Sequence, residues 1–305
     1  MAGSKKGPIY AAMAANLGIA IAKFIASGIT GSSAMLSEGI HSLVDTGNGF
    51  LLLYGINRSK KAPDEAHPFG YGKEVYFWSL VVAVLIFAVG GGMSFYEGII
   101  HLQHPEPMGD PTINYIVLAV AMVFEGAALF AAMKSFNKTR GRRGFWEAVR
   151  RSKDPTSFAV IFEDGAALLG LAVAMLGVYL GHTFQEPMFD GAASIVIGIL
   201  LTVISILLAY ESKALLIGES AEPEMVDQIK DIVMGHDQVL TMNTPITMHM
   251  APDQVLLALD VEFSDELESD EIEKVVAQLE AKIRANIPIV KRIFIEAKAI
   301  STPRN

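Results

Sequence analysis

The sequence predicts a membrane protein of six transmembrane helices followed by a small α+β domain. The 305 residues are 51% hydrophobic and only 19% charged, with a mean hydropathy of +0.39, whereas a soluble protein carries about a quarter charged residues. The hydrophobic residues concentrate before residue 218, and the chain beyond it is charged and acid-rich. We therefore expect a membrane domain over residues 1–215 and a separate domain over residues 216–305.

Hydrophobic segments of membrane-spanning length recur along the first part of the chain. About 20 apolar residues in a helix cross the hydrocarbon core of a bilayer. Asp154-Pro155 marks one helix start, with Asp as N-cap and Pro at the first helical position. The predicted spans cover residues 8–28, 33–56, 75–100, 112–135, 156–181 and 190–210.

Basic residues alternate between successive connections. The N-terminus carries Lys5 and Lys6, and the second and fourth connections are also basic. Connections 28–32, 101–112 and 181–187 contain no Lys or Arg. Because cytoplasmic loops carry the excess of Lys and Arg, we expect both termini in the cytoplasm. The chain is predicted to be a multi-pass protein of the cell inner membrane.

The chain after the spans has the patterns of a small soluble domain. Helical and strand periodicities alternate there, and their order is typical of an α+β fold. We predict helices over Glu222–Met234 and Ser269–Ala285, and strands over Val239–Met250, Gln254–Phe263 and Ile293–Ile295.

Composition excludes several classes of function. There are no cysteines, so a transition-metal site must use His, Asp, Glu, Asn or backbone oxygen. The net charge of −9 argues against a nucleic-acid partner. The basic fourth connection suits anionic lipid better than nucleic acid. We find no Gly-rich phosphate loop and no nucleophile–base arrangement, so we expect no enzyme.

The second span carries a polar stripe. Glu38, His41 and Asp45 are three and four residues apart, so they share one side of a helix. Ionisable groups at membrane depth are costly and usually mark an ion path. Imidazole with carboxylate suits a divalent transition ion such as zinc, with cobalt, iron or manganese also possible.

The fifth span carries two adjacent carboxylates, Glu163 and Asp164. Neighbouring residues lie about 100° apart on a helix, so the two cannot share one face. We expect Asp164 to be a metal ligand, because small residues follow it and allow another helix to approach closely. Glu163 is a second ligand, a proton carrier or a partner of a ligand. Because metal binding to such carboxylates expels protons, we hypothesise an exchange of metal against protons.

Other polar residues in the spans are weaker candidates. Glu125 and Asp190 are candidates for supporting or access groups at the ion path. Asn48 is expected to bond across helices. Lys23 is expected to snorkel towards the membrane surface.

Several histidines lie outside the predicted spans or at their ends. His101 and His104, on the side opposite the basic connections, are expected to be solvated, with the collection or release of metal as the alternative. His236 and His249 are the two histidines of the C-terminal domain, and we expect them to be ordinary surface residues rather than a regulatory metal site.

At this point the motifs resemble those of the cation diffusion facilitators. The resemblance rests on His41-x-x-x-Asp45, on His67-Pro68-Phe69-Gly70-Tyr71-Gly72 before the third span, and on Asp164. It covers nearly the whole chain. It implies a homodimeric exporter of divalent metal, driven by proton antiport, with a ferredoxin-like cytoplasmic domain. His67 is expected either to bind metal or to set the turn before the third span.

The sequence departs from the family pattern in the fifth span. The zinc-transporting pattern has a second His-x-x-x-Asp there, and Val160 occupies the position of its His. This departure, with Glu163 beside Asp164, resembles the subgroup around the ninth human zinc transporter. The loss of one imidazole makes the site richer in oxygen, which weakens the preference for zinc and admits iron, manganese or cobalt.

Our leading hypothesis is a proton-coupled antiporter in the lipid bilayer that exports divalent transition-metal cations, with zinc favoured. The alternative is a membrane-bound metal sensor or scaffold that binds but does not transport metal. The expected metal site comprises His41, Asp45, Asp164, Glu163 and Glu38.

Overall fold

The computed structural model describes residues 6–105 and 109–300. Lys5 and part of the third connection, residues 106–108, lie outside the described residues. The chain divides into two compact units. The helical unit comprises residues 1–58 and 74–213, and the sheet unit comprises residues 59–73 and 214–305.

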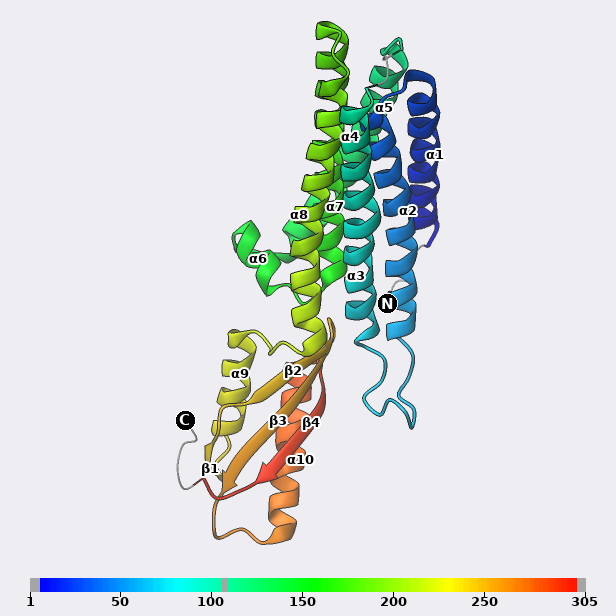
Figure 1. Cartoon of the computed structure of the whole chain (residues 1–305). Helices are drawn as coiled ribbons and strands as arrows, with labels where there is room; N and C mark the ends of the chain where they lie inside the picture. Colours follow the sequence, from blue (N-terminus) through cyan, green and yellow to red (C-terminus); the bar gives the residue numbers. More distant parts are fainter. Residues whose placement is uncertain (1–5, 106–108, 301–305) are drawn as a thin grey trace. The chain divides into compact units, whose positions relative to one another are not determined.

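The helical unit is a bundle of long helices (Figure 1). Its elements are α1 (Lys6–Thr30), α2 (Ser33–Ser59), α3 (Glu74–Leu85), the π-helical segment η1 (Ile86–Gly91), α4 (Gly92–Gln103), α5 (Thr112–Thr139), α6 (Phe145–Arg151), α7 (Pro155–Phe184) and α8 (Met188–Ile217, which continues into the sheet unit).

Within the described residues, five helical stretches are long and apolar enough to cross a membrane: α1, the continuous α3–η1–α4 segment, α5, α7 and α8. The second predicted span coincides with α2, which has 27 residues but is less apolar because it carries Glu38, Asp45 and Arg58. The chain is thus a multi-pass helical membrane protein, and the membrane crossing by α2 stays a prediction.

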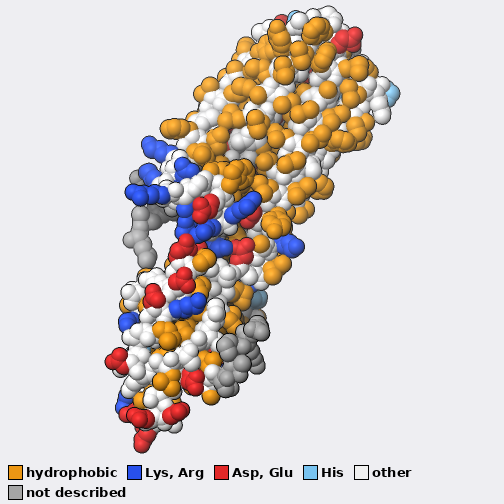
Figure 2. All heavy atoms as spheres, turned by 90° about the vertical axis from the view of Figure 1, so that its left-hand side faces the viewer, with side chains coloured by type: hydrophobic (Ala, Val, Ile, Leu, Met, Phe, Trp, Pro, Cys, Tyr) orange, Lys and Arg blue, Asp and Glu red, His pale blue; other side chains and the backbone are white. Residues whose placement is uncertain are grey.

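The surface of the helical unit is apolar. Figure 2 shows hydrophobic side chains covering one face of the bundle almost continuously. Val123, Phe130 and Tyr210 are large apolar residues with exposed side chains, as expected of helices that face lipid. Inside the bundle, Leu118, Leu171, Ile197 and Leu201 belong to a core that water does not reach.

Glycines allow α4 and α8 to approach closely. A Cβ atom at Gly98 would lie 2.6 Å from Cγ1 of Ile195 and 2.7 Å from the carbonyl oxygen of Gly191, and a Cβ at Gly198 would lie 2.8 Å from the amide nitrogen of Phe95. Small residues at helix contacts are typical of membrane bundles.

The sheet unit is an α+β domain. Its elements are α9 (Pro223–Met234), β1 (Val239–Met242), β2 (Ile246–Ala251), β3 (Gln254–Phe263), α10 (Ser269–Asn286) and β4 (Val290–Ala297). Strand β3 is central: β1 and β2 pair with its two ends antiparallel, and β4 pairs with it in parallel. Burial alternates along all ten residues of β3, and both helices pack on the apolar side of the sheet.

Two predicted strands differ from the structure. The single strand predicted over residues 239–250 is interrupted between β1 and β2 by Asn243-Thr244-Pro245, where the proline has no N–H to give to a ladder. The last strand extends over β4 rather than over three residues, because it pairs with β3 from Val255 to Val261.

The segment before the third predicted span belongs to the sheet unit. A Cβ atom at Gly72 would lie 2.5 Å from the carbonyl oxygen of Met250, so the loop backbone lies directly against β2. Lys73 Nζ donates to the carbonyl oxygen of Leu216 at 3.2 Å. The Phe69 and Phe294 rings meet edge to face, with centroids 6.4 Å apart.

Asp64 organises the same loop from within. It accepts hydrogen bonds from Lys61 Nζ, the Tyr71 hydroxyl and the backbone N–H of His67. The bonds from Lys61 and Tyr71 hold the pKa of Asp64 well below its usual value. The carbonyl oxygen of His67 accepts the N–H of Gly70, whose φ of 86° closes the turn. The backbone of His67 is therefore part of this turn.

We predict that Gly72→Ala releases the loop from the sheet unit. The added methyl group would overlap the β2 backbone, and such overpacking costs about 1–3 kcal/mol. Trypsin should then cleave after Lys60 and Lys61 several-fold faster in detergent-solubilised protein. Gly144→Ala is the matched control, because nothing lies within 4 Å of that position. Equal cleavage rates in both variants would contradict the prediction.

Candidate metal centre

The polar stripe of α2 lies in the interior of the bundle. His41 is 1% exposed, and its Nε2 atom lies 3.4 Å from Oδ2 of Asp45, one helical turn further on. Among the described residues, neither ring nitrogen of His41 has a hydrogen-bond partner, and neither does Oδ1 of Asp45. Buried polar atoms are normally paired, so these atoms are available to a ligand.

Helix α7 faces this stripe with Glu163 and Asp164. Oε1 of Glu163 accepts a hydrogen bond from Nδ2 of the fully buried Asn48 at 3.3 Å, which joins α7 to α2. Asn48 thus bonds across helices, as the sequence indicated. Oδ2 of Asp164 is buried and has no partner among the described residues.

Carboxylates of α5 and α7 lie near Asp45 of α2. Its electrostatic neighbours are Glu163, Asp164 and Glu125, the last of these contributed by α5. Glu125 is 4% exposed and also interacts electrostatically with Glu163 and Asp164. In the sequence, Glu125 is a weaker candidate than the other carboxylates, because a single carboxylate in an otherwise apolar span is its only signal.

Lys23 does not snorkel. It is fully buried, and its Nζ lies 2.9 Å from Oε2 of Glu38 and 2.8 Å from Oγ of Ser42. The expectation was wrong because Glu38 of α2 supplies a counter-charge to Lys23 of α1 inside the bundle. Oε1 of Glu38 has no partner among the described residues and points at Gly170 of α7, whose missing side chain leaves room for it.

This arrangement can bind a cation that supplies positive charge to several oxygens at once. The carboxylates repel one another in an apolar surrounding, and Lys23 neutralises only one charge. In the described part of the chain, no three His, Asp or Glu side chains enclose a common point at metal-binding distance.

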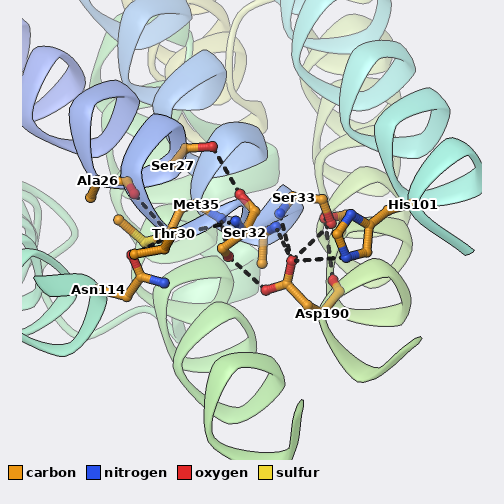
Figure 3. A network of polar contacts seen from close by, with 11 residues as sticks. Ala26, Ser27, Thr30, Ser32, Ser33, Met35, His101, Asn114 and Asp190 are labelled. Carbon is orange, nitrogen blue, oxygen red and sulfur yellow. Dashed lines mark hydrogen bonds and ion pairs between the residues drawn. The ribbon is translucent and has the colours of Figure 1, made fainter. Parts of the chain in front are cut away.

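Asp190 lies at another site, the N-terminus of α2 (Figure 3). Its Oδ1 accepts the hydroxyl of Ser32 at 2.6 Å, and its Oδ2 accepts the backbone N–H groups of Ser33 and Ala34 at 2.5 Å and 3.2 Å. The carboxylate therefore caps a helix from a different chain segment, which local capping rules in the sequence do not reveal.

Two histidines that were expected at the surface are buried. His101 is 6% exposed and lies against Asp190, and His249 is 3% exposed within the sheet unit. Their burial comes from tertiary packing that spacing alone does not show. His236 shares a hydrogen bond of 3.0 Å with Gln278.

Two protein domain families match most of the chain. The cation efflux transmembrane domain family matches residues 9–217, and the cation efflux cytoplasmic domain family matches residues 221–298. The chain belongs to the cation efflux family. Members of this family are transporters rather than enzymes, which confirms that the chain is no enzyme.

Relatives support the subgroup that the sequence indicated. The chain is 36% identical over 243 residues to the proton-coupled zinc antiporter SLC30A9, mitochondrial, of Xenopus laevis, and 34% identical to that of Homo sapiens. These alignments cover 79% of this chain but 44% and 43% of the relatives, so the chain spans less than half of their length. The cation-efflux pump FieF of Escherichia fergusonii is 28% identical over 267 residues, 87% of this chain and 83% of that protein.

We predict that Lys23 and Glu38 depend on each other. Breaking one partner of a buried pair costs about 3–5 kcal/mol, whereas replacing both leaves no uncompensated charge. Lys23→Gln and Glu38→Gln should each lower the thermal midpoint of the detergent-solubilised protein strongly, and the double variant should recover most of the loss. Lys213→Gln, at an exposed position, is the control. A double variant as unstable as the worse single one would contradict the pairing.

Proposed function

We propose that the protein is a proton-coupled antiporter that exports divalent transition-metal cations, with zinc favoured and iron, manganese or cobalt also accepted. The observation that carries the proposal is the set of unpartnered imidazole and carboxylate atoms that α2 and α7 bury side by side. The printed name of the 34–36% identical relatives, a proton-coupled zinc antiporter, supports the same activity.

The residues take different roles in this proposal. His41, Asp45 and Asp164 bind the ion, because their free atoms face the interior from two helices. Glu163, held by Asn48, acts as a further ligand or as the proton carrier. Glu38 supports the site rather than binding the ion directly, because Lys23 occupies one of its oxygens.

Proton coupling arises because protons and the metal ion neutralise the same carboxylates. Asp45, Glu125, Glu163 and Asp164 are neutralised either by protons or by a divalent ion, and each displaces the other. If the helices expose the site alternately to the two sides, a proton gradient drives the metal in the opposite direction.

We also propose a topology, an oligomeric state and a membrane location for the transporter. Six spans, including α2, place both termini in the cytoplasm, in keeping with the alternation of basic connections. The C-terminal domain belongs to the cytoplasmic domain family of cation efflux proteins, which supports assembly as a homodimer. The bacterial relative FieF supports residence in the cell inner membrane.

We expect metal uptake into proteoliposomes to depend on Asp45 and Asp164. Asp45→Ala and Asp164→Ala should each reduce zinc uptake more than tenfold, because each removes a charged ligand, and a proton gradient should alter wild-type uptake. Asp227→Ala, at an exposed position on α9, should leave uptake unchanged. Binding of zinc without uptake of any of the four metals would favour the alternative, a membrane-bound sensor or scaffold.

We expect Val160→His to shift metal preference. Val160 precedes Asp164 by one helical turn, so an imidazole there would lie on the same side of α7. Nitrogen ligands favour zinc over manganese. The ratio of zinc to manganese uptake should rise several-fold, whereas Val160→Leu should leave it unchanged. An unchanged ratio in both variants would place position 160 away from the ion.

A further inference from the structure

A cavity opens in the helical unit at the end of the bundle where α1 ends and α2 begins. Its volume is about 330 Å³. It lies beside the first and third connections, which carry no Lys or Arg. Its lining includes Ser32, Ser33, Glu97, His101 and His104.

His101 gives this cavity its chemical character. The residue is 6% exposed, and its Nε2 has no hydrogen-bond partner among the described residues. The nearest charged atom is Oδ2 of Asp190, 3.9 Å away, which is too far for a hydrogen bond (Figure 3). A buried imidazole nitrogen without a partner is costly and is satisfied by a ligand.

Asp190 cannot supply that partner. Its two oxygens already accept hydrogen bonds from the hydroxyls of Ser32 and Ser33 and from the N-terminal N–H groups of α2. The carboxylate is therefore fixed in place. Its negative charge beside His101 still favours a cation in the cavity.

Two further ligand types lie on the same side of α4. Glu97 and His104 stand four residues before and three residues after His101, which places all three on one helix face. His104 is the C-cap of α4, with a non-helical φ of −131°, so its exposed ring can turn without unwinding the helix. No described lining residue is a lysine or arginine that would repel a cation.

We propose that this cavity is a second binding site for a divalent transition-metal cation, with His101, His104 and Glu97 as its ligands. Two imidazoles and one carboxylate suit zinc and its neighbours, and do not suit magnesium or calcium. The site lies on the side opposite the basic connections, so it receives the exported ion before release. This role in release rests on the proposed transport function, but binding of the ion at the site does not.

The test is cobalt(II) binding to the full chain in detergent, in a variant that carries Asp45→Ala and Asp164→Ala. Those changes remove the ligands of the mid-bundle centre, so the cavity should be the remaining strong site. We expect visible absorption typical of cobalt with nitrogen ligands, at about one ion per chain, that excess magnesium does not displace.

Substitutions of the cavity residues then show which side chains bind the cobalt. His101→Gln should abolish the absorption, and His104→Gln and Glu97→Gln should weaken binding several-fold. His182→Gln, an exposed histidine near the end of α7, is the matched control and should change nothing. If His101→Gln does not fold, the two less buried positions decide the question.

The two proposals fail separately. Absence of cobalt binding in the background variant, or binding that none of the three cavity substitutions changes, would overturn the cavity site. Cavity binding in a wild-type protein that transports no metal would overturn the antiporter and leave the site in place.

Discussion

Carboxylates enclosed among apolar helices are the constraint on which the helical unit depends. Asp45, Glu125, Glu163 and Asp164 come from three helices and interact electrostatically, with Glu125 and Glu163 buried and Asp45 and Asp164 half-buried. No packing of hydrocarbon compensates for such charges. Protons, a cation or fixed hydrogen-bond donors must neutralise these carboxylates for the bundle to be stable. What the carboxylates bind is therefore linked to the conformation of the helices around them.

Fixed contacts position the helices around this site. Asn48 ties α2 to α7, Lys23 ties α1 to α2, and Asp190 of α8 holds the first N–H groups of α2. Helix α2 is therefore held at three levels along its length by three different helices. His41 and Asp45, two of the proposed metal ligands, lie between these fixed points. The rigid frame therefore surrounds side chains with buried atoms that lack a hydrogen bond among the described residues.

The sequence predicted what local patterns determine and missed what distant segments supply. The polar face of α2, the pair in α7 and the α+β character of the C-terminal domain follow from helical and strand periodicity. The burial of Lys23 and His101 and the capping role of Asp190 depend on partners that lie 15, 89 and 157 residues away. Helix α2 falls outside the stretches apolar enough to span a membrane, because Glu38, Asp45 and Arg58 lower its mean hydropathy.

The π-helical segment Ile86–Gly91 adds a consequence for how such a protein can change in evolution. A π turn inserts residues into a helix, and each inserted residue rotates everything beyond it by about 100°. The face that α4 presents to its cavity is thus set by the length of the chain through η1. Loss or gain of a single residue there would redirect Glu97 and His101 together, without altering either of them. The number of residues in η1 therefore determines where Glu97 and His101 point as strongly as their residue types determine what they can bind.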